Sequence, residues 1–98
     1  MNTEWIETFL TIVNCGSINL AAEALFLSQS TISTRLALLE EALGFSLLFR
    51  AKGRRNLMLT SEGIDFLPLA KHMIELKNDA RDIRNHNHRL SRWFVHAL

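Results

Sequence analysis

The clearest helical pattern in this chain lies in residues 28–44, which read SQSTISTRLALLEEALG. Ser28 is placed to cap the N-terminus of a helix, and Gly44 is placed to end that helix in the left-handed conformation. Between them, apolar residues recur at steps of four, three and four and form one narrow stripe, made of Ile32, Leu36, Leu39 and Leu43. The stretch therefore predicts an amphipathic helix over residues 29–43.

The outer face of this helix is small and rich in hydroxyl groups. At about 100° per residue, Ser30, Thr34 and Ala37 lie opposite the apolar stripe, with Ser33 on the shoulder. Short hydroxyl side chains let a helix approach a polar surface closely, and a DNA major groove is wide enough to admit a helix and is lined with donors and acceptors. From this stretch alone, a helix that reads DNA and an ordinary surface helix rich in Ser and Thr are both open.

Composition bounds the chain to one domain, or one small domain with an extension. Of its 98 residues 48% are hydrophobic, which is enough for a small core, and its net charge of +1 does not by itself indicate a polyanionic partner. The positive charge is concentrated beside the helix described above. Residues 29–55 hold five basic and two acidic residues, whereas residues 1–28 hold three glutamates and no Lys or Arg.

The expected compartment is the cytoplasm. A single cysteine, Cys15, excludes an intramolecular disulfide and suits a reducing environment. The start of the chain lacks the basic and apolar regions of a signal peptide, and no apolar segment approaches the length of a membrane span. We therefore expect no membrane partner.

Two shorter helices are predicted before the hydroxyl-faced one. Residues 3–15 read as a helix ended by Gly16, with an apolar face made of Trp5, Phe9, Ile12 and Val13, joined by Ile6 and Leu10. Ser17 can cap a second helix over about 18–25, whose inner face is Ile18, Ala21, Ala22 and Leu25. Two short helices joined by a tight turn, the second with a polar outer face, make a helix-turn-helix.

A β-hairpin is predicted after Gly44. Residues 47–50 and 57–59 are short apolar runs, and residues 51–56 between them contain Gly and Asn as turn formers. This hairpin would be the wing of a winged helix, with basic side chains at its tip and base: Arg50, Lys52, Arg54 and Arg55. A solvated loop is the plainer interpretation, but four basic residues in six positions favour contact with an anion, and phosphate is the natural one.

A fourth, long helix is predicted from about residue 61 to the upper eighties, capped by Thr60 and kinked near residues 64–68 by Pro68. Its apolar positions alternate at steps of three and four, as in a heptad seam. The seam comprises Phe66, Leu69, Met73, Leu76, Ala80, Ile83, Asn87 and Leu90. The stripe could pack on its own domain, but the helix exceeds about 35 Å and so is longer than a small domain needs. Self-association is therefore favoured.

Enzymatic interpretations find little support. Cys15 falls in the last turn of a predicted helix with no His nearby in sequence, which favours a small buried residue over a nucleophile. His86 and His88 are two positions apart and point to different sides of a helix, so they make a poor metal pair. The sequence predicts no catalytic residue, no cofactor and no metal.

Over residues 5–85 the chain resembles the DNA-binding domain of the LysR-type transcriptional regulators. No single match is diagnostic, but together, in order and nearly without gaps, they are highly specific. The matching residues are Phe9, Gly16-Ser17, Ala21-Ala22, Leu25, Ser28-Gln29, Ser33, Leu39-Glu40, Leu43-Gly44, Leu47, Arg50, Leu59-Thr60 and Gly63.

The resemblance implies a mostly α protein, with a winged helix-turn-helix over residues 1–60 and a linker or dimerisation helix with a tail over residues 61–98. It places DNA contacts at the start of the third helix and on the wing. From the resemblance and the charge pattern together we expect DNA-binding residues at Ser28, Gln29, Ser30, Thr31, Ser33, Thr34, Arg35, Arg50, Lys52, Arg54 and Arg55. Dimerisation is expected to use Phe66, Leu69, Met73, Leu76, Ala80, Ile83 and Leu90.

Three departures from the family pattern bear on function. Position 30 is often Pro and is Ser here, and position 34 is often Arg and is Thr here, which puts a direct base contact at 34 in doubt. The wing is about two residues longer than usual, so the register of Lys52, Arg54 and Arg55 is open. Finally, the family continues into a sensor domain that binds a small-molecule inducer. No such domain follows within these 98 residues, so no inducer is expected for this chain, whether it is a fragment or a naturally short protein.

The hypothesis is sequence-specific binding of double-stranded DNA by a homodimer or higher oligomer, at a pseudo-palindromic operator, with helix 29–43 in the major groove and wing 50–56 on the backbone or minor groove. The alternative belongs to another class. A truncated regulator would act as a protein-interaction module that pairs through its long helix with a full-length relative.

Overall fold

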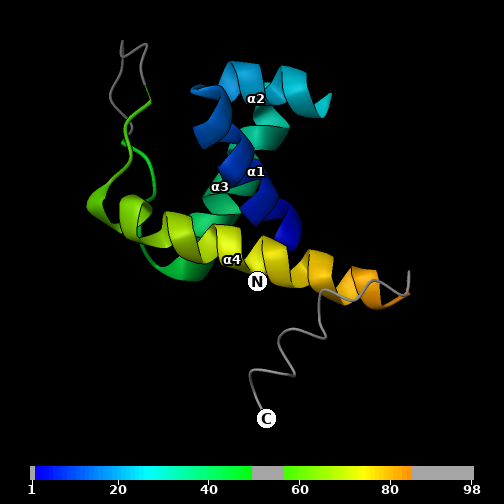
Figure 1. Cartoon of the computed structure of the whole chain (residues 1–98). Coiled ribbons are helices and arrows are strands. Elements are labelled where there is room, and N and C mark those ends of the chain that lie inside the picture. Colours follow the sequence, from blue (N-terminus) through cyan, green and yellow to red (C-terminus); the bar gives the residue numbers. More distant parts are fainter. Residues whose placement is uncertain (1, 50–56, 85–98) are drawn as a thin grey trace.

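The computed structural model of the chain describes residues 2–49 and 57–84. Four helices follow one another in the described part: α1 (Thr3–Cys15), α2 (Ile18–Leu25), α3 (Gln29–Leu43) and α4 (Ser61–Arg84). Figure 1 shows α2 at one end of α1 and α4 crossing the other end, with α3 packed behind α1. The three helices expected before the hairpin are confirmed at residues 3–15, 18–25 and 29–43.

Local capping explains why the first three helices begin and end where they do. Ser17 accepts a hydrogen bond from the backbone N–H of Leu20, and Ser28 accepts one from the N–H of Thr31 at 3.1 Å. Gly44 adopts the left-handed conformation, with φ of 83°, and its N–H donates to the carbonyl of Glu40 at 2.8 Å. These caps were predicted from residue type alone.

Helix α2 ends at a residue that the sequence did not single out. Phe26 has φ of 56°, in the left-handed region that bulky residues rarely adopt, and its side chain is 94% exposed. Its N–H donates to the carbonyl of Glu23 at 3.3 Å, and the next N–H, of Leu27, donates to Ala22 at 3.0 Å. The helix-turn-helix turn is therefore closed by backbone hydrogen bonds, with an aromatic side chain left in solvent.

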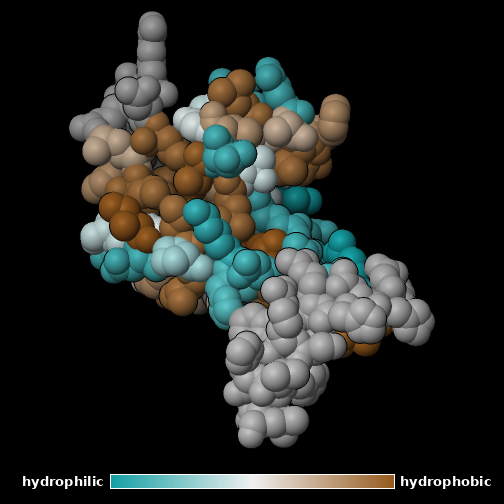
Figure 2. Space-filling model, viewed as in Figure 1, coloured by the Kyte–Doolittle hydropathy of each residue, from teal (hydrophilic) through white to brown (hydrophobic). Residues whose placement is uncertain are grey.

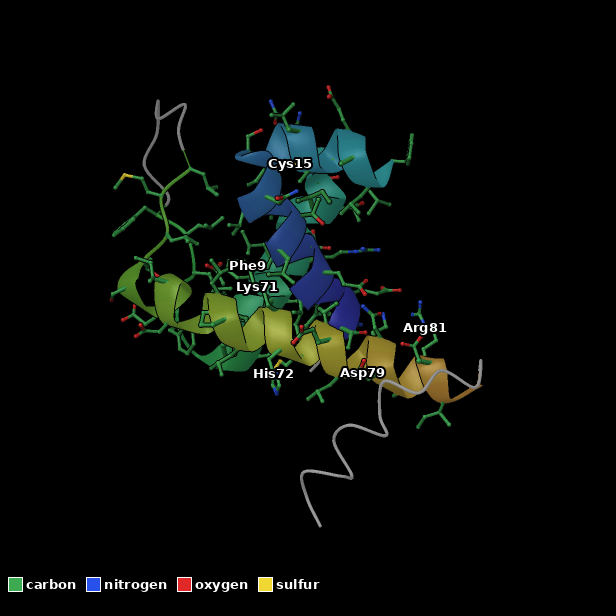
Figure 3. All side chains as sticks on the ribbon, in the orientation of Figure 1. Phe9, Cys15, Lys71, His72, Asp79 and Arg81 are labelled. Carbon is green, nitrogen blue, oxygen red and sulfur yellow. The ribbon has the colours of Figure 1, made fainter. Side chains whose placement is uncertain are left out.

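The core is built around α1, which packs against α2, α3 and α4. Phe9 of α1 is fully buried, and its ring lies 5.8 Å from that of Phe66 on α4, between centroids. Figure 3 shows Phe9 where α1 crosses α4. The buried apolar residues are Ile6, Phe9, Ile12, Ala21, Ala22, Ile32, Leu36, Leu39, Leu47, Leu48, Phe66 and Ala70. The apolar stripe predicted for α3 thus faces the core, with Leu43 half-buried at its end.

A short antiparallel pairing forms the base of the wing. Leu48 and Leu59 make a β-bridge, Phe49 N–H donates to the Met58 carbonyl at 3.0 Å, and Thr60 N–H donates to the Leu47 carbonyl at 3.0 Å. Residues 47–49 and 58–60 are thus paired at the positions where the hairpin was expected. The tip, residues 50–56, lies outside the described residues. The fold class is a mostly α winged helix-turn-helix followed by a long helix, as predicted.

Helix α4 has two apolar faces. It begins as expected at Thr60, whose Oγ1 accepts from the N–H of Gly63 at 2.9 Å, and it continues as one helix through Pro68. One face enters the core through Phe66 and Ala70, which are 3% and 0% exposed. The core therefore extends across the boundary expected between residues 60 and 61.

The other face of α4 lies in solvent. Its apolar residues recur at steps of four, three, four and three and are all exposed: Leu69, Met73, Leu76, Ala80 and Ile83. Most of the predicted seam is thus free in the single chain. The assignment of Phe66 to this seam is corrected, because Phe66 packs on Phe9 inside the chain's own core and does not lie on the exposed face. Asn87 and Leu90 lie outside the described residues.

A polar contact ties α4 to α1. Lys77 of α4 donates to Glu7 of α1 at 2.8 Å, and both side chains are partly buried. Where α1 and α4 cross, Figure 2 shows hydrophilic side chains, whereas apolar ones gather beside the base of the hairpin, where Phe49 and Met58 are exposed. This ion pair adds a directional contact between α1 and α4, which also pack together through Phe9 and Phe66.

Within the described residues, no single helix combines the length and apolar character that crossing a membrane requires. Helices α1 and α2 meet that criterion only when taken together, and they are bent by 119° relative to each other. The residues at their junction include Gly16, which has φ of 85°.

Candidate nucleic-acid interface

The first part of the candidate interface is the outer face of α3. Gln29, Ser30, Ser33 and Thr34 are exposed, and Thr31 is partly buried. Because Ile32 and Leu36 on the opposite side are fully buried, the core fixes which way this hydroxyl face points. The sequence prediction that Ser33 and Thr34 are accessible is confirmed.

The side chain of Ser28 caps the N-terminus of α3. Its Oγ accepts from Thr31 N–H at 3.1 Å and lies 3.0 Å from Ser30 Oγ and 2.9 Å from Thr31 Oγ1. Three hydroxyl groups are therefore gathered at the N-terminus of α3, where the helix dipole is positive and backbone N–H groups point outward. Such an end can receive a phosphate oxygen.

Arg35 does not belong to this face. Its guanidinium turns to α1, where Nη1 donates to Thr8 Oγ1 at 3.5 Å and Nη2 lies 3.8 Å from Glu4 Oε2. Its side chain is 27% exposed. Position 35 lies on the flank of the helix that packs beside α1, so this arrangement does not favour the expected contact between Arg35 and DNA. The exposed outer face of α3, from Ser30 to Ala37, consequently carries no charged side chain.

The predicted basic residues of the wing are Arg50, Lys52, Arg54 and Arg55, and they lie outside the described residues. What the structure places is the base from which they extend. Leu47 and Leu48 follow α3 after a short loop, and Leu59 pairs with Leu48 before α4 begins. The wing therefore extends from a base that is joined to both α3 and α4.

One polar residue at this base was not recognised from the sequence. Glu40, on α3, accepts a hydrogen bond from Leu47 N–H at 2.6 Å through its Oε2, and the N–H of Leu48 lies 3.5 Å from the same oxygen. In the sequence Glu40 reduced the positive charge of residues 29–55 and, unlike Glu41, was one of the residues of the family resemblance, but it was assigned no role. Its contact with Leu47 could not be predicted, because it depends on how the chain returns after Gly44.

The described residues show no grouping suited to metal chemistry. Within residues 2–49 and 57–84, no cluster of three or more His, Cys, Asp or Glu side chains could hold a metal ion. Cys15 lies at the α2 end of α1, whereas His72 lies on α4 (Figure 3). His86 and His88 lie outside the described residues.

These features define a winged helix-turn-helix protein, in which the second helix of the motif exposes a hydroxyl face and a hairpin follows it. Residues 3–64 match the family described as "Bacterial regulatory helix-turn-helix protein, lysR family". The chain belongs to this family, and its helix-turn-helix is the family's DNA-binding domain. The family is one of transcriptional regulators and is not an enzyme family.

Curated relatives agree with this assignment. The chain is 36% identical over 97 residues to the HTH-type transcriptional regulator HdfR of Salmonella newport, and the match covers 99% of this chain and 34% of the relative. HdfR of Salmonella typhimurium matches equally. The chain thus spans about a third of the length of the curated relatives it matches.

Similar solved structures include complexes with DNA. CbnR, a LysR family transcriptional regulator, is 30% identical with a TM-score of 0.80 over 91% of this chain and 30% of CbnR. The DNA-binding domain of CbnR in its DNA complex gives the same identity and TM-score over 91% of this chain and 100% of that domain. The DNA-binding domain of BenM on benA site 1 DNA is 28% identical, with a TM-score of 0.79 over 88% of this chain and 94% of that domain.

Proposed function

We propose that this chain binds double-stranded DNA sequence-specifically as a dimer and serves as the DNA-binding part of a LysR-type transcriptional regulator acting in the cytoplasm. The observation that carries the proposal is the outer face of α3 from Ser30 to Ala37, which is uncharged, exposed and rich in hydroxyl groups, and which lies at the capped N-terminus of the helix. The DNA-bound structures of the CbnR and BenM domains support it.

Recognition of bases is assigned to the start of α3. Gln29 can pair bidentately with adenine in the major groove. Ser30, Ser33 and Thr34 can contact base edges, thymine methyl groups or phosphates. The backbone N–H groups beside Ser28 favour a phosphate, which would fix the depth of the helix in the groove.

Affinity and register are assigned to the basic residues of the wing. Arg50, Lys52, Arg54 and Arg55 are expected to neutralise phosphates on the DNA backbone or at the minor groove. Contacts of this kind carry little sequence information, so these residues act on all duplexes alike.

Dimerisation is assigned to the free apolar face of α4. Leu69, Met73, Leu76 and Ile83 are 57%, 37%, 44% and 61% exposed, and their spacing repeats over two heptads. A run of exposed apolar side chains on one helix face favours a second apolar helix as its partner. Two domains joined in this way present two recognition helices to a pseudo-palindromic operator.

Selection from a pool of random duplexes tests the proposal. The purified chain is expected to enrich a two-fold symmetric sequence, and its affinity for that sequence is expected to exceed its affinity for a scrambled duplex by at least about 1,000-fold. Equal affinity for both duplexes, or no binding to either by a folded chain, would overturn it.

A second candidate function, a protein-interaction module, is favoured by the same exposed face of α4. In that case the chain pairs through residues 66–90 with a longer relative and alters its regulation. Strong helix pairing in sedimentation experiments, combined with negligible affinity for any enriched duplex, would select this alternative.

A further inference from the structure

The backbone on both sides of Leu47 joins three parts of the domain. From one side, the Leu47 N–H donates to Glu40 Oε2 at 2.6 Å, and the next N–H, of Leu48, lies 3.5 Å from the same oxygen. Hydrogen bonds to a carboxylate are shorter and stronger than those to neutral acceptors. Since Glu40 is part of α3, this carboxylate fixes the first strand of the hairpin to the helix that carries Ser33 and Thr34.

From the other side, the same stretch of backbone is held by the start of α4. Thr60 N–H donates to the Leu47 carbonyl at 3.0 Å, and Thr60 Oγ1 donates to the Ser46 carbonyl at 2.6 Å. Gly63 lies so close that a Cβ there would be 2.3 Å from the Leu47 carbonyl oxygen. The second strand and α4 thus close on Leu47 with no room for a side chain between them.

Side-chain packing also restrains the backbone at Leu47 and Leu48. The Leu47 side chain is 0% exposed, and that of Leu48 is 3% exposed, so the backbone there cannot rotate without opening the core. Among the side chains of α3, Glu40 forms a hydrogen bond with the hairpin base. Its position on α3 is six residues after Thr34, which is about 9 Å along the axis.

We propose that Glu40 is a positioning residue that sets the direction of the hairpin relative to α3, and thereby presents the wing to DNA while α3 occupies the major groove. The inference rests on the proposed function for its DNA readout. Glu40 is an acidic residue in a region expected to meet a polyanion. Its removal would make this region more positive, and yet we expect the removal to weaken DNA binding.

The test compares Glu40→Ala with Glu41→Ala. Glu41 is the neighbouring acid, it is exposed, and its removal changes the net charge by the same amount. Charge alone predicts that both variants bind DNA more tightly than the wild type. Positioning predicts that Glu41→Ala binds slightly more tightly, whereas Glu40→Ala binds the selected duplex about tenfold more weakly than Glu41→Ala, because a hydrogen bond to a charged group is lost.

Two further variants separate positioning from folding. Glu40→Gln keeps an amide oxygen that can accept from Leu47 N–H, so it is expected to recover part of the affinity and to remain folded if Glu40→Ala does not. In an Arg54→Ala background the effect of Glu40→Ala is expected to shrink to less than about threefold, because the residue acts through the wing. Affinities are measured at temperatures where circular dichroism shows every variant folded.

Amide hydrogen exchange gives a readout that does not need DNA. Faster exchange at Leu47 and Leu48 in Glu40→Ala, with α1 unchanged, is the expected result. Unchanged exchange at both amides would overturn the inference whether or not the chain binds a duplex. If the wild type binds its selected duplex and Glu40→Ala equals Glu41→Ala, the inference fails and the proposed function stands. If the wild type enriches no duplex, the proposed function fails by itself.

Discussion

Helices α3 and α4 pack on the same core but present different outer faces. On α3 a single apolar stripe is buried, and the opposite side carries Ser30, Ser33 and Thr34. On α4 one apolar side is buried through Phe66 and Ala70, while a second apolar stripe, beginning at Leu69, remains exposed. The two helices therefore offer surfaces of opposite chemistry in one small domain.

This difference indicates which kind of partner each helix suits. A short, uncharged, hydroxyl-bearing face can exchange its hydrogen bonds to water for hydrogen bonds to a polar surface such as a DNA groove, at little cost in free energy. An exposed apolar stripe is stabilised most by contact with another apolar surface, which removes both from water.

The largest expected effect is on stability, and it distinguishes the two faces of α4. Phe66→Ala removes a buried ring that packs on Phe9 and should lower the free energy of unfolding of the monomer by about 3–5 kcal/mol. Leu69→Ala, on the exposed face, should change it by about 0.5 kcal/mol or less. Urea unfolding over a range of protein concentrations separates the monomer term from dimer dissociation. Similar losses for both variants would show that α4 has no free face.

The next effect concerns the dimer. Met73→Asp places a carboxylate in the exposed stripe and should raise the dimer dissociation constant at least about 100-fold, since an unpaired buried charge costs about 3 kcal/mol or more. Asn78→Asp adds the same charge to the same helix at an exposed position outside the stripe and serves as the control. Sedimentation equilibrium measures both. An unchanged dimer in Met73→Asp would remove α4 from the interface.

Base readout and phosphate contact should separate in a third comparison. Gln29→Ala is expected to lose about 1–3 kcal/mol of discrimination at one base pair of each half-site, with little effect on random duplexes. Arg54→Ala is expected to weaken binding to every duplex and to reduce the salt slope by about one. Fluorescence anisotropy at several salt concentrations checks both. Equal effects of the two changes on cognate and random duplexes would contradict this assignment of roles.

The smallest effect is expected at Arg35. Its guanidinium lies beside Thr8 and Glu4 of α1, so Arg35→Ala should change duplex affinity less than about threefold and leave the salt slope unaltered. Its partly exposed pair with Glu4 should contribute less than about 1 kcal/mol to stability. A salt slope lowered by about one in this variant would instead place Arg35 against a phosphate.

Helix boundaries were predictable because their causes are local. Ser17, Ser28 and Thr60 cap the helices they precede, and Gly16 and Gly44 end the helices they follow. Each of these effects depends on residue type and on neighbours within one turn. The buried stripe of α3 followed from spacing in the same way.

The corrections concern long-range packing. Phe66 and Met73 are seven residues apart and share a heptad position, yet Phe66 meets Phe9 of the same chain while Met73 is exposed. Heptad spacing cannot tell which turns of a helix lie over their own domain. Arg35 and Glu40 are similar cases, because their partners, Thr8 and Leu47, come from other segments that only the folded chain brings close. The sequence carries no local signal for such contacts.

The contact of Phe9 with Phe66 has a consequence for how two copies of the domain would face an operator. In the described part of the chain, the core that holds α3 also holds the first turns of α4, so the element assigned to DNA and the one assigned to pairing are packed together. In a dimer, the distance and angle between two recognition helices would then be set by side-chain packing inside each subunit. A core substitution that turned α4 by a few degrees without lowering stability would change which half-site separation fits, and so which promoters respond.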